Sequence, residues 1–446
     1  MSSLATMSSL AALPVPPELV HEILAHLTAA SDCATCLQSD LASLSATSRI
    51  FNAIVTPYLY ANITLLSSHD SDSELAYSRR AHTLQHTLET TAHGALVRRL
   101  QFAPTQPATE KCWAPIVERT PDLRALQGVA QYFPPENDEE EDEVAPATLL
   151  KLPALRTAVL YQECLPVPLG ELLAAWPALD TLVLGDLSGD DIVYADLAAM
   201  GAGVRNLHFH DFEAEGADGD AALAALPAHL ESLRIDYSLG MSLRGVAQYL
   251  PRATRLRELA FVNQLRGSNG AADVLACVRA ASGLRRMELG LVRYPRDAHD
   301  AVPFGAALEN ATLEELVWRG VYMDAAAAGS GEDELVELVV ASVDSLPKLR
   351  LLRVGATVRG GGDGVEMYAG LRAVCARDDS AFTDDAAKVG AGGKRVLVVF
   401  EDDAGFVDGP TAASMKLGED AEEGAVCGVF KVEDEEEKEC TGEWEA

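Results

Sequence analysis

A short apolar pattern, L-x-x-L-x-L, recurs along most of the chain and constrains its fold more than any other feature. Clear copies, in which other apolar residues also fill the leucine positions, begin at Leu179, Val204, Leu230, Leu256, Leu284, Leu313 and Leu349. Weaker copies begin at Val97, Leu123, Leu155 and Lys394. Most of the clear copies follow one another at about 25–29 residues, which leaves room for one strand and one helix or loop. Because a unit of this size cannot bury its apolar side alone, we expect the units to stack along the chain.

Segments rich in Ala, Leu and Val separate the copies, and their apolar spacing predicts helices. These segments are 169–176, 221–226, 243–250, 272–281 and 334–346. Each is followed by a residue that ends a helix just before the next copy, namely Pro177, Pro227, Pro251, Gly283 and Pro347. This alternation of helix, turn and short strand resembles that of leucine-rich-repeat proteins. The resemblance implies an α/β solenoid with a parallel sheet on the concave side and the helices outside.

The template divides its residues between two faces of the predicted sheet, because side chains alternate along a strand. Positions 4 and 6 of each copy should point into the core, while positions 3, 5 and 7 should point onto the concave face. Mixed charges on a rigid face favour protein recognition. The candidate target-binding residues on this face are His208, His210, Arg234, Asp236, Glu258, Arg286, Glu288, Arg319 and Arg353.

Position 9 departs from the usual repeat, in which Asn or Cys bonds the backbone of the turn. In this chain the position holds Leu187, Phe212, Ser238, Gln264 and Val292. The resemblance is therefore to irregular repeats, and an α/β domain of another topology stays open as the alternative.

Residues 13–66 lack the repeat and carry apolar residues at the spacing of three short helices. The run Val-Pro-Pro-Glu-Leu-Val-His-Glu-Ile-Leu at 15–24 resembles the opening of an F-box, and 44–52 resembles its second half. The segments 57–60 and 63–65 are similar to the tail that follows this module in many fungal-type F-box proteins.

An F-box docks through an apolar surface on the Skp adaptor of a cullin–RING ubiquitin ligase. The resemblance therefore implies a Skp-type adaptor, and through it a cullin–RING ligase, as partners of this chain. The residues that match the contact positions are Pro16, Leu19, Ile23 and Leu24. Two other interpretations stay open. The apolar residues could form only a helical core, or the helices could be a cap on the solenoid that is unrelated to an F-box.

The charge of the chain disfavours two classes of partner. Its 68 acidic and 35 basic residues give a formal net charge of −33, which repels nucleic-acid phosphates and anionic lipid surfaces. No apolar run approaches the ~18 residues of a membrane span, and the eight cysteines show no regular spacing. We therefore expect reduced thiols and a cytoplasmic or nuclear location, with neither nucleic acid nor membrane as the main partner.

The remaining domain boundaries concern the two ends of the chain and one acidic insertion. We expect a disordered N-terminus at 1–12 and repeats over 67–400. The six consecutive acidic residues Asp138–Glu143 indicate a loop insertion at 136–147, with attraction of a basic partner as the alternative. Residues 401–446 are acidic and are predicted to form a mostly disordered tail.

Few residues suggest chemistry. His208 and His210, followed by Asp211, occupy alternate positions of a predicted strand and could bind a metal or perform acid–base chemistry. The pattern identifies no further ligand or nucleophile, so we interpret them as polar residues on a ligand-facing sheet, with a hydrolase as the alternative. Cys33 and Cys36 lack further zinc ligands at suitable spacing. We therefore expect no catalytic residue, metal or cofactor.

The predicted function is an adaptor that holds a target protein near a ubiquitin ligase, and the alternative is a leucine-rich-repeat scaffold with no ligase role.

Overall fold

The chain divides into two compact units, Met1–Val204 and Arg205–Ala446, which we call the first and the second unit. The computed structural model describes residues 16–30, 34–65, 74–102, 110–129, 148–161, 168–185, 194–198, 200–212, 218–236, 238, 240–262, 271–290, 310, 312–324, 346–359 and 397–402. The predicted N-terminal segment 1–12 and acidic loop 136–147 lie outside these residues. Residues 403–446 of the predicted tail and 334–345 of a predicted helix also lie outside them.

Three helices open the first unit and share one small apolar core. They are α1 (Pro17–Ala30), α2 (Ala34–Thr47) and α3 (Arg49–Ala61). Ser48 caps α3, because its hydroxyl accepts a hydrogen bond from the backbone N–H of Phe51 at 3.2 Å. The buried core consists of Val20, Leu24, Leu41 and Val55, with Leu37, Leu44, Phe51, Ile54, Tyr58 and Leu59 packed against it.

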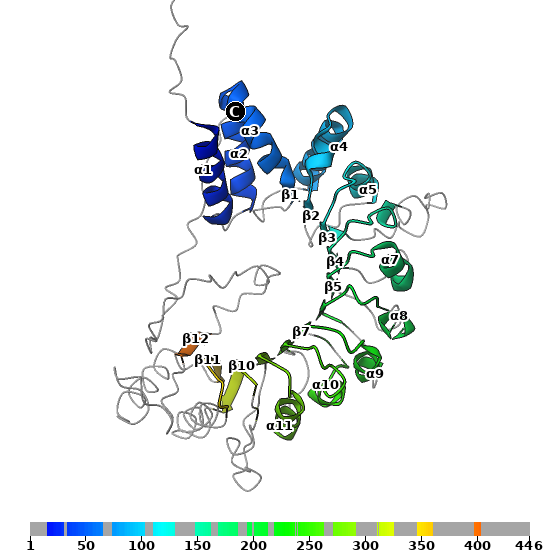
Figure 1. Cartoon of the computed structure of the whole chain (residues 1–446), viewed down its shortest axis with the longest axis vertical. Coiled ribbons are helices and arrows are strands. Elements are labelled where there is room, and N and C mark those ends of the chain that lie inside the picture. Colours follow the sequence, from blue (N-terminus) through cyan, green and yellow to red (C-terminus); the bar gives the residue numbers. More distant parts are fainter. Residues whose placement is uncertain are drawn as a thin grey trace, which may run out of the picture. The chain divides into compact units, whose positions relative to one another are not determined.

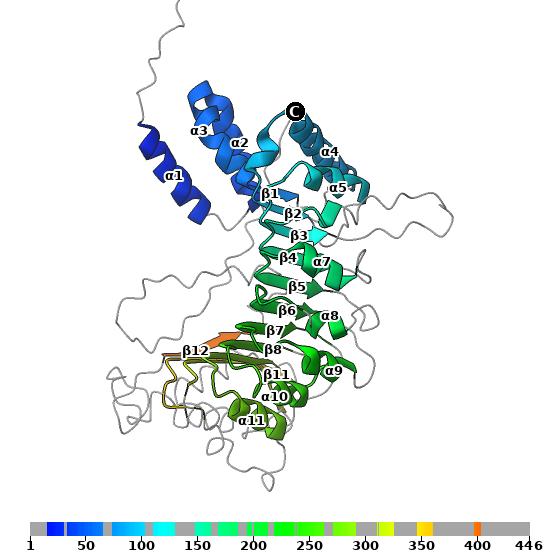
Figure 2. The ribbon, with the colours of Figure 1, turned by 45° about the vertical axis from the view of Figure 1, so that its right-hand side comes forward.

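A parallel sheet follows directly from the helical module in the first unit. Its strands, in spatial and chain order, are β1 (Asn62–Leu65), β2 (Arg99–Phe102), β3 (Ala125–Val129), β4 (Thr157–Tyr161) and β5 (Thr181–Gly185). Figure 2 shows these strands stacked beside one another. Strand β1 lies inside the residues 13–66 that the sequence assigns to the helical module. The backbone explains the difference, since the carbonyl of Ala61 at the end of α3 accepts a 2.9 Å hydrogen bond from Arg98 N–H, just before β2.

One glycine in the first unit occupies a position that no other residue fits. Gly128 has a φ of 77°, in the left-handed region. It lies where the register between β3 and β4 shifts, between Gln127 and Val129. A Cβ atom at Gly128 would stand 2.3 Å from the carbonyl oxygen of Phe102 on β2. The strand can therefore bulge here without a clash only because the residue is glycine.

The second unit repeats the same construction. Its strands are β6 (Asn206–His210), β7 (Ser232–Asp236), β8 (Glu258–Val262), β9 (Arg286–Gly290), β10 (Glu315–Asp324), β11 (Leu351–Arg359) and β12 (Leu397–Asp402). Neighbours in this order are parallel and hydrogen-bonded. Strand β12 continues two residues into the segment 401–446 that was predicted as a tail.

In the described residues, helices connect many of the successive strands and lie on one side of each sheet. In the first unit they are α4 (Glu74–Thr90), the 3-10 helix η1 (His93–Leu96), α5 (Glu110–Glu118), α7 (Leu169–Ala175) and α8 (Tyr194–Ala198). In the second unit they are α9 (Asp218–Ala225), α10 (Leu243–Tyr249) and α11 (Ala271–Ala280), which Figure 1 shows along the outer side of the strands. Helices α7, α9, α10 and α11 coincide with predicted helices. No helix in the described parts of the chain is long and apolar enough to cross a membrane.

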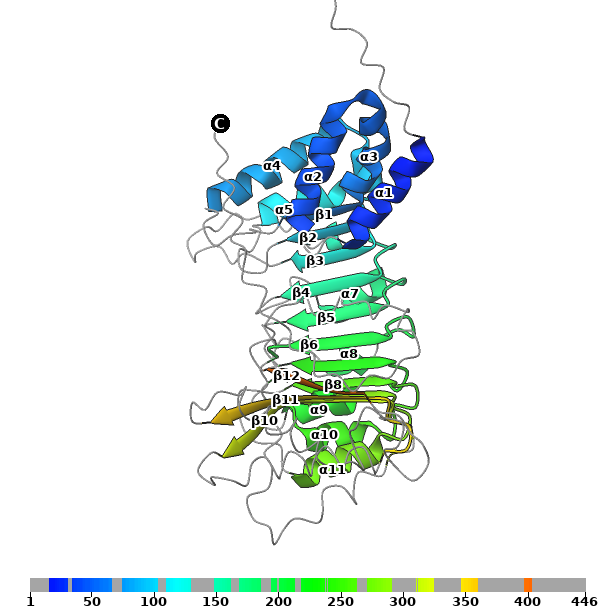
Figure 3. The same cartoon turned by 90° about the vertical axis from the view of Figure 1, so that its left-hand side faces the viewer.

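The arrangement of the strands confirms the predicted leucine-rich-repeat solenoid. Every copy of the template begins two or three residues before an observed strand, and Figure 3 shows the resulting ladder of arrows within each unit. Positions 4 and 6 are buried wherever their side chains are described; in β7 they are Leu233 and Ile235, both with 0% exposure. At position 2, the backbone carbonyl accepts hydrogen bonds from backbone N–H groups of the next repeat. The carbonyl of Arg205, for example, accepts hydrogen bonds from the N–H groups of Glu231 at 2.8 Å and Ser232 at 3.1 Å. Because strand order follows chain order with parallel neighbours, the alternative topology is excluded within each unit.

Candidate protein-binding surfaces

The first candidate surface is an apolar stripe on α1. Leu19, Ile23 and Leu27 are spaced by four residues and therefore lie along one face of the helix. Their exposed fractions are 47%, 47% and 43%, which is unusual for large apolar side chains in a folded domain. Pro16, directly before the helix, is also exposed. We call these four residues the α1 stripe.

The fourth predicted contact residue lies elsewhere. Leu24 has 0% exposure and packs in the helical core with Val20. The sequence placed Leu24 on the same apolar face as Ile23, but one residue step turns the helix by about 100°, which moves Leu24 to the buried side. Leu24 therefore stabilises the module, and Leu27 takes its place on the stripe. The four-residue spacing from Ile23 was the signal that could have identified Leu27.

The second candidate surface is the face of the second unit's sheet that the helices do not cover, which we call the helix-free face. It holds template positions 3, 5 and 7. On β6 and β7 the register pairs His208 with Arg234 and His210 with Asp236. Each of the four side chains thus has a neighbour on the adjacent strand, as predicted from the alternation along the strands.

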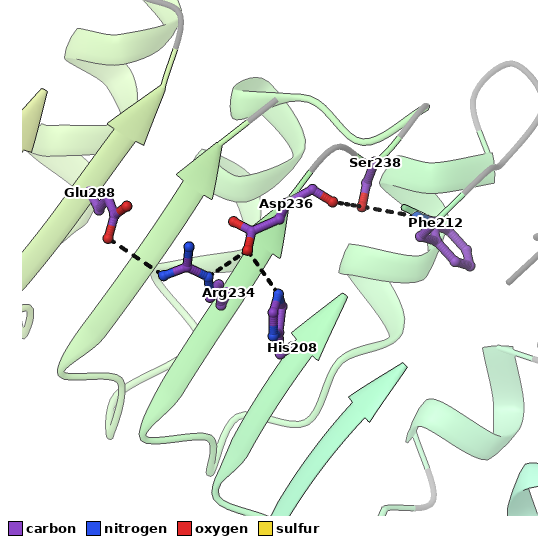
Figure 4. Close-up of polar contacts among 6 residues, drawn as sticks. All are labelled: His208, Phe212, Arg234, Asp236, Ser238 and Glu288. Carbon is purple, nitrogen blue, oxygen red and sulfur yellow. Dashed lines mark hydrogen bonds and ion pairs between the residues drawn. The ribbon is translucent and has the colours of Figure 1, made fainter. Parts of the chain in front are cut away.

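A chain of polar contacts links three strands across this face. The Nε2 of His208 lies 2.9 Å from Oδ2 of Asp236. Since a carboxylate oxygen accepts only, His208 donates this hydrogen bond through Nε2–H. Arg234 Nε donates to the same oxygen, and its Nη1 lies 3.6 Å from Oε2 of Glu288 on β9. Figure 4 shows the four side chains on one face of the sheet, where Arg234 and Glu288 approach each other past the intervening strand β8.

Two of the predicted target-binding residues are too deeply buried to contact a target. Asp236 is 6% exposed and Glu288 is 2% exposed. Their role is to hold Arg234, whose side chain is 28% exposed, between two carboxylates. The prediction considered only the direction of each side chain. It did not include the crowding of neighbouring side chains on this face.

Burial and charge shift the pKa values of the contacting pair. Burial lowers the pKa of His208 below its ordinary 6.5, and the hydrogen bond to Asp236 opposes this effect without outweighing it. Burial also disfavours the ionised form of Asp236. The hydrogen bond from His208 and the positive charge of Arg234 outweigh that effect and hold the pKa of Asp236 below its ordinary 3.8. At neutral pH, His208 is therefore neutral and Asp236 beside it is ionised.

The turn after β6 changes the composition of the predicted histidine cluster. Asp211 adopts a left-handed conformation with φ of 52°, and its N–H donates to the carbonyl of Asp236 at 2.9 Å. The cluster therefore consists of His208, His210 and Asp236, whose possible ligand atoms all lie within 4.8 Å of one another. Ser238, at template position 9, supports the same backbone by donating its hydroxyl to the carbonyl of Asp236 at 3.2 Å. The sequence did not indicate Asp236 as a member of the cluster, because 25 residues separate it from Asp211.

The remaining predicted residues lie on β8 to β11. Glu258 is exposed and pairs in register with Arg286. Arg286 Nε lies 3.5 Å from Oε1 of Glu315 on β10, a partner that the prediction missed. Arg353 on β11 is half-buried. Arg319 belongs to β10 and pairs in register with Gly290, but its side chain lies outside the described part of the structure.

Comparisons with known proteins place this chain in no family. No family model and no curated protein matches the sequence. Among solved structures, a complex of Rad7 and Elc1 in yeast shares 14% identity over 76% of this chain and 88% of that chain, with a TM-score of 0.36. The leucine-rich-repeat-containing protein LegL7 from Legionella pneumophila shares 14% identity over 53% of this chain and 84% of that chain, with a TM-score of 0.31. A TLR13–ssRNA13 complex shares 14% identity over 68% of this chain and 35% of that chain, also with a TM-score of 0.31. The assignment of the repeat fold therefore rests on the strand order and register of this chain.

Proposed function

We propose that this protein is a substrate-recognition adaptor of a cullin–RING ubiquitin ligase of the SCF type. The helical module of the first unit docks a Skp-type adaptor, and the helix-free face of the second unit binds the target protein. The chain itself supplies no catalytic group. It acts by holding the target near the enzyme that carries ubiquitin, because positioning two reactants can remove much of the entropic barrier to reaction.

The α1 stripe is the observation that carries this proposal. Three large apolar side chains stay about half exposed on one helix, although the same helix buries Val20 and Leu24. Exposed apolar residues gathered on one face are typical of interaction sites. Ile50 of α3, at 70% exposure, adds a further apolar side chain on the surface of the module. The F-box resemblance assigns adaptor contact to three members of the stripe, Pro16, Leu19 and Ile23.

The second unit suits the target-binding role for a different reason. The half-buried Arg234, Arg286 and Arg353 and the exposed Glu258 form a fixed charge pattern on a hydrogen-bonded sheet. Charges held in place select partners by complementarity more than they raise affinity. Arg234 and Arg286 are each held by at least one carboxylate within 3.6 Å. Their direction is therefore set before a target arrives.

Binding of a purified Skp-type adaptor to the full-length chain tests the proposal. We expect saturable binding, and we expect Ile23→Asp to weaken it by at least about 30-fold, the equivalent of a ~2 kcal/mol hot spot. The matched control is Ala25→Asp, which adds the same charge at an exposed position about 160° away on the same helix. This control should bind the adaptor as the unaltered chain does.

The alternative function is a leucine-rich-repeat binding scaffold with no ligase role. The charge pattern of the second unit supports it as well, because that pattern requires no adaptor. Absence of adaptor binding by a folded full-length chain, or equal binding by Ile23→Asp and Ala25→Asp, would favour this alternative. The three helices would then be a cap that closes one end of the first unit's sheet.

A further inference from the structure

We propose that His208, His210 and Asp236 form a binding site for a divalent first-row transition ion, of which zinc is the representative. The site lies on the helix-free face of the second unit and is independent of the proposed adaptor function. It would use one nitrogen from each imidazole and one carboxylate oxygen, and it would leave at least one coordination position free.

The strands bring the three donors together without any loop movement. His208 and His210 are two residues apart on β6 and therefore point to the same face, and their ring centroids are 5.9 Å apart. Asp236 pairs in register with His210 on the adjacent strand. The possible ligand atoms lie within 4.8 Å of one another. Zinc bonds of about 2.0–2.2 Å place tetrahedral ligands about 3.3 Å apart, so rotation of side chains by roughly 1–2 Å at their tips completes the site.

An unused oxygen of Asp236 is the second, independent indication. The side chain of Asp236 is 8% exposed, and its Oδ2 holds both His208 and Arg234. Its Oδ1 is also buried and has no hydrogen-bond partner among the described residues. A buried carboxylate oxygen without a partner is costly, and a bound cation would satisfy it.

The surrounding charges permit a cation despite the nearby arginine. Arg234 contributes one positive charge, but Asp236 and Glu288 contribute two negative charges around it. Arg234 can stay on Asp236 Oδ2 and Glu288 while Oδ1 binds the ion. This arrangement matches metal sites in which a hydrogen-bonded neighbour orients a carboxylate ligand.

The donor set determines the class of ion. Two imidazoles and one carboxylate suit zinc and other first-row transition ions, whereas magnesium and calcium prefer oxygen ligands alone. Three protein ligands leave a position open toward the helix-free face. A histidine or carboxylate of a bound target protein could occupy that position, which would make target binding depend on the metal.

Calorimetric titration of the full-length, chelator-treated chain with zinc tests the site. We expect saturable binding that includes one equivalent at this site, and no corresponding binding of magnesium. His210→Ala should lower the affinity of that equivalent by at least about 100-fold, because it removes a direct ligand. The matched control is His86→Ala, which removes an exposed histidine of α4. It should leave the binding of that equivalent unchanged.

Cobalt absorption separates this site from the cysteines. A cobalt ion held by imidazole and carboxylate gives visible bands without thiolate charge-transfer absorption. His208→Gln provides a second variant, and circular dichroism verifies that both variants are folded. Equal zinc affinity for the unaltered chain and the folded His208→Gln and His210→Ala variants would overturn the proposal. Thiolate charge transfer as the only cobalt signal, or absence of zinc binding, would also overturn it.

Discussion

The two units share one strand template but present different side chains on the faces opposite their helices. In the first unit, the residues at position 5 and its registered equivalent on β1 are uncharged, namely Thr64, Gln101, Gln127, Val159 and Val183. In the second unit the same row holds His208, Arg234, Ala260, Glu288, Val317 and Arg353. The buried positions 4 and 6 are apolar in both. The core positions therefore specify the fold, while the opposite face is free to vary with function.

The difference also suggests a division of roles between the units. In the first unit the position-5 row of the sheet is uncharged, and a separate helical module carries the apolar α1 stripe. The second unit has a charged sheet face, with Arg234 held between Asp236 and Glu288. The proposed function would place apolar contact with the adaptor and charge-selective contact with a target on separate parts of the chain.

The largest expected effect is a loss of unfolding free energy that distinguishes a core residue of β6 from a neighbouring residue on the helix-free face. Phe209 on β6 is fully buried, and its ring centroid lies 5.4 Å from that of Phe212. Phe209→Ala should lower the free energy of unfolding by about 3–5 kcal/mol, because it leaves a cavity. The neighbouring His210→Ala, measured in metal-free buffer, should lower it by less than about 1 kcal/mol. Urea denaturation measures both, and similar losses would contradict the assignment of the two faces.

The next effect distinguishes the charged row of the second unit from the uncharged row of the first. Arg234→Met leaves Asp236 and Glu288 buried without their cation. Because Arg234 is partly exposed, we expect a loss of about 2–3 kcal/mol in unfolding free energy, below the ~3–5 kcal/mol of a fully buried pair. Gln127→Met, at the same template position in β3, should change it by less than about 1 kcal/mol. Equal losses in urea denaturation would remove the distinction between the rows.

Acid should weaken the second unit through the His208–Asp236 pair. The pKa of His208 is lowered in the folded state, so stability falls once the pH drops below the ordinary value of 6.5, where the unfolded chain takes up the proton more readily. The pKa of Asp236 is also lowered, so its ionised form stabilises the fold until the pH falls through its folded value. Between about pH 7.5 and 5.5 the histidine dominates, and the thermal midpoint should decrease. His208→Asn should reduce this decrease, and an unchanged pH dependence in that variant would contradict the stated cause.

The smallest expected effect concerns an exposed charge. Glu258→Lys reverses a charge on the helix-free face at a residue that is exposed to solvent. We expect a change in unfolding free energy of less than about 0.5 kcal/mol, because surface substitutions of this kind rarely matter for stability. Thermal denaturation measures it. A large loss would show that Glu258 supports the sheet, as Arg234 does, and that it does not belong to a free recognition surface.

Much of the fold was predictable, because the repeat template encodes burial directly. Leu233 and Ile235 are buried and Arg234 points to the opposite face, as alternation along a strand requires. Strand β1 was missed as part of the sheet because its residues do not carry the template and directly follow a helix. The structural role of Asn310 was missed for another reason. Its side-chain amide donates to the carbonyls of Val278 and Ala281 in the preceding repeat, at 3.0 Å and 2.8 Å. Such hydrogen bonds form only when successive repeats stack on one another.

The sequence predicted a face of the helix or strand for each site residue, but not how deeply each side chain is buried. Helical periodicity placed Leu19, Ile23 and Leu24 together, but only packing in the three-helix core decides which of them is buried. Likewise, the sequence indicated His208 and His210, but it paired them with Asp211 because of proximity along the chain. The actual partner, Asp236, comes from the next strand, and its identity depends on the register between β6 and β7.

Adaptor binding by two charge variants tests the division of roles most directly. A purified Skp-type adaptor is titrated into the full-length chain carrying either Ile23→Asp in the α1 stripe or Glu258→Lys on the helix-free face. If the α1 stripe docks the adaptor and the second unit's face does not, Ile23→Asp loses binding and Glu258→Lys retains it. Retained binding by a folded Ile23→Asp variant, or comparable loss by Glu258→Lys, would contradict the separation of the two surfaces.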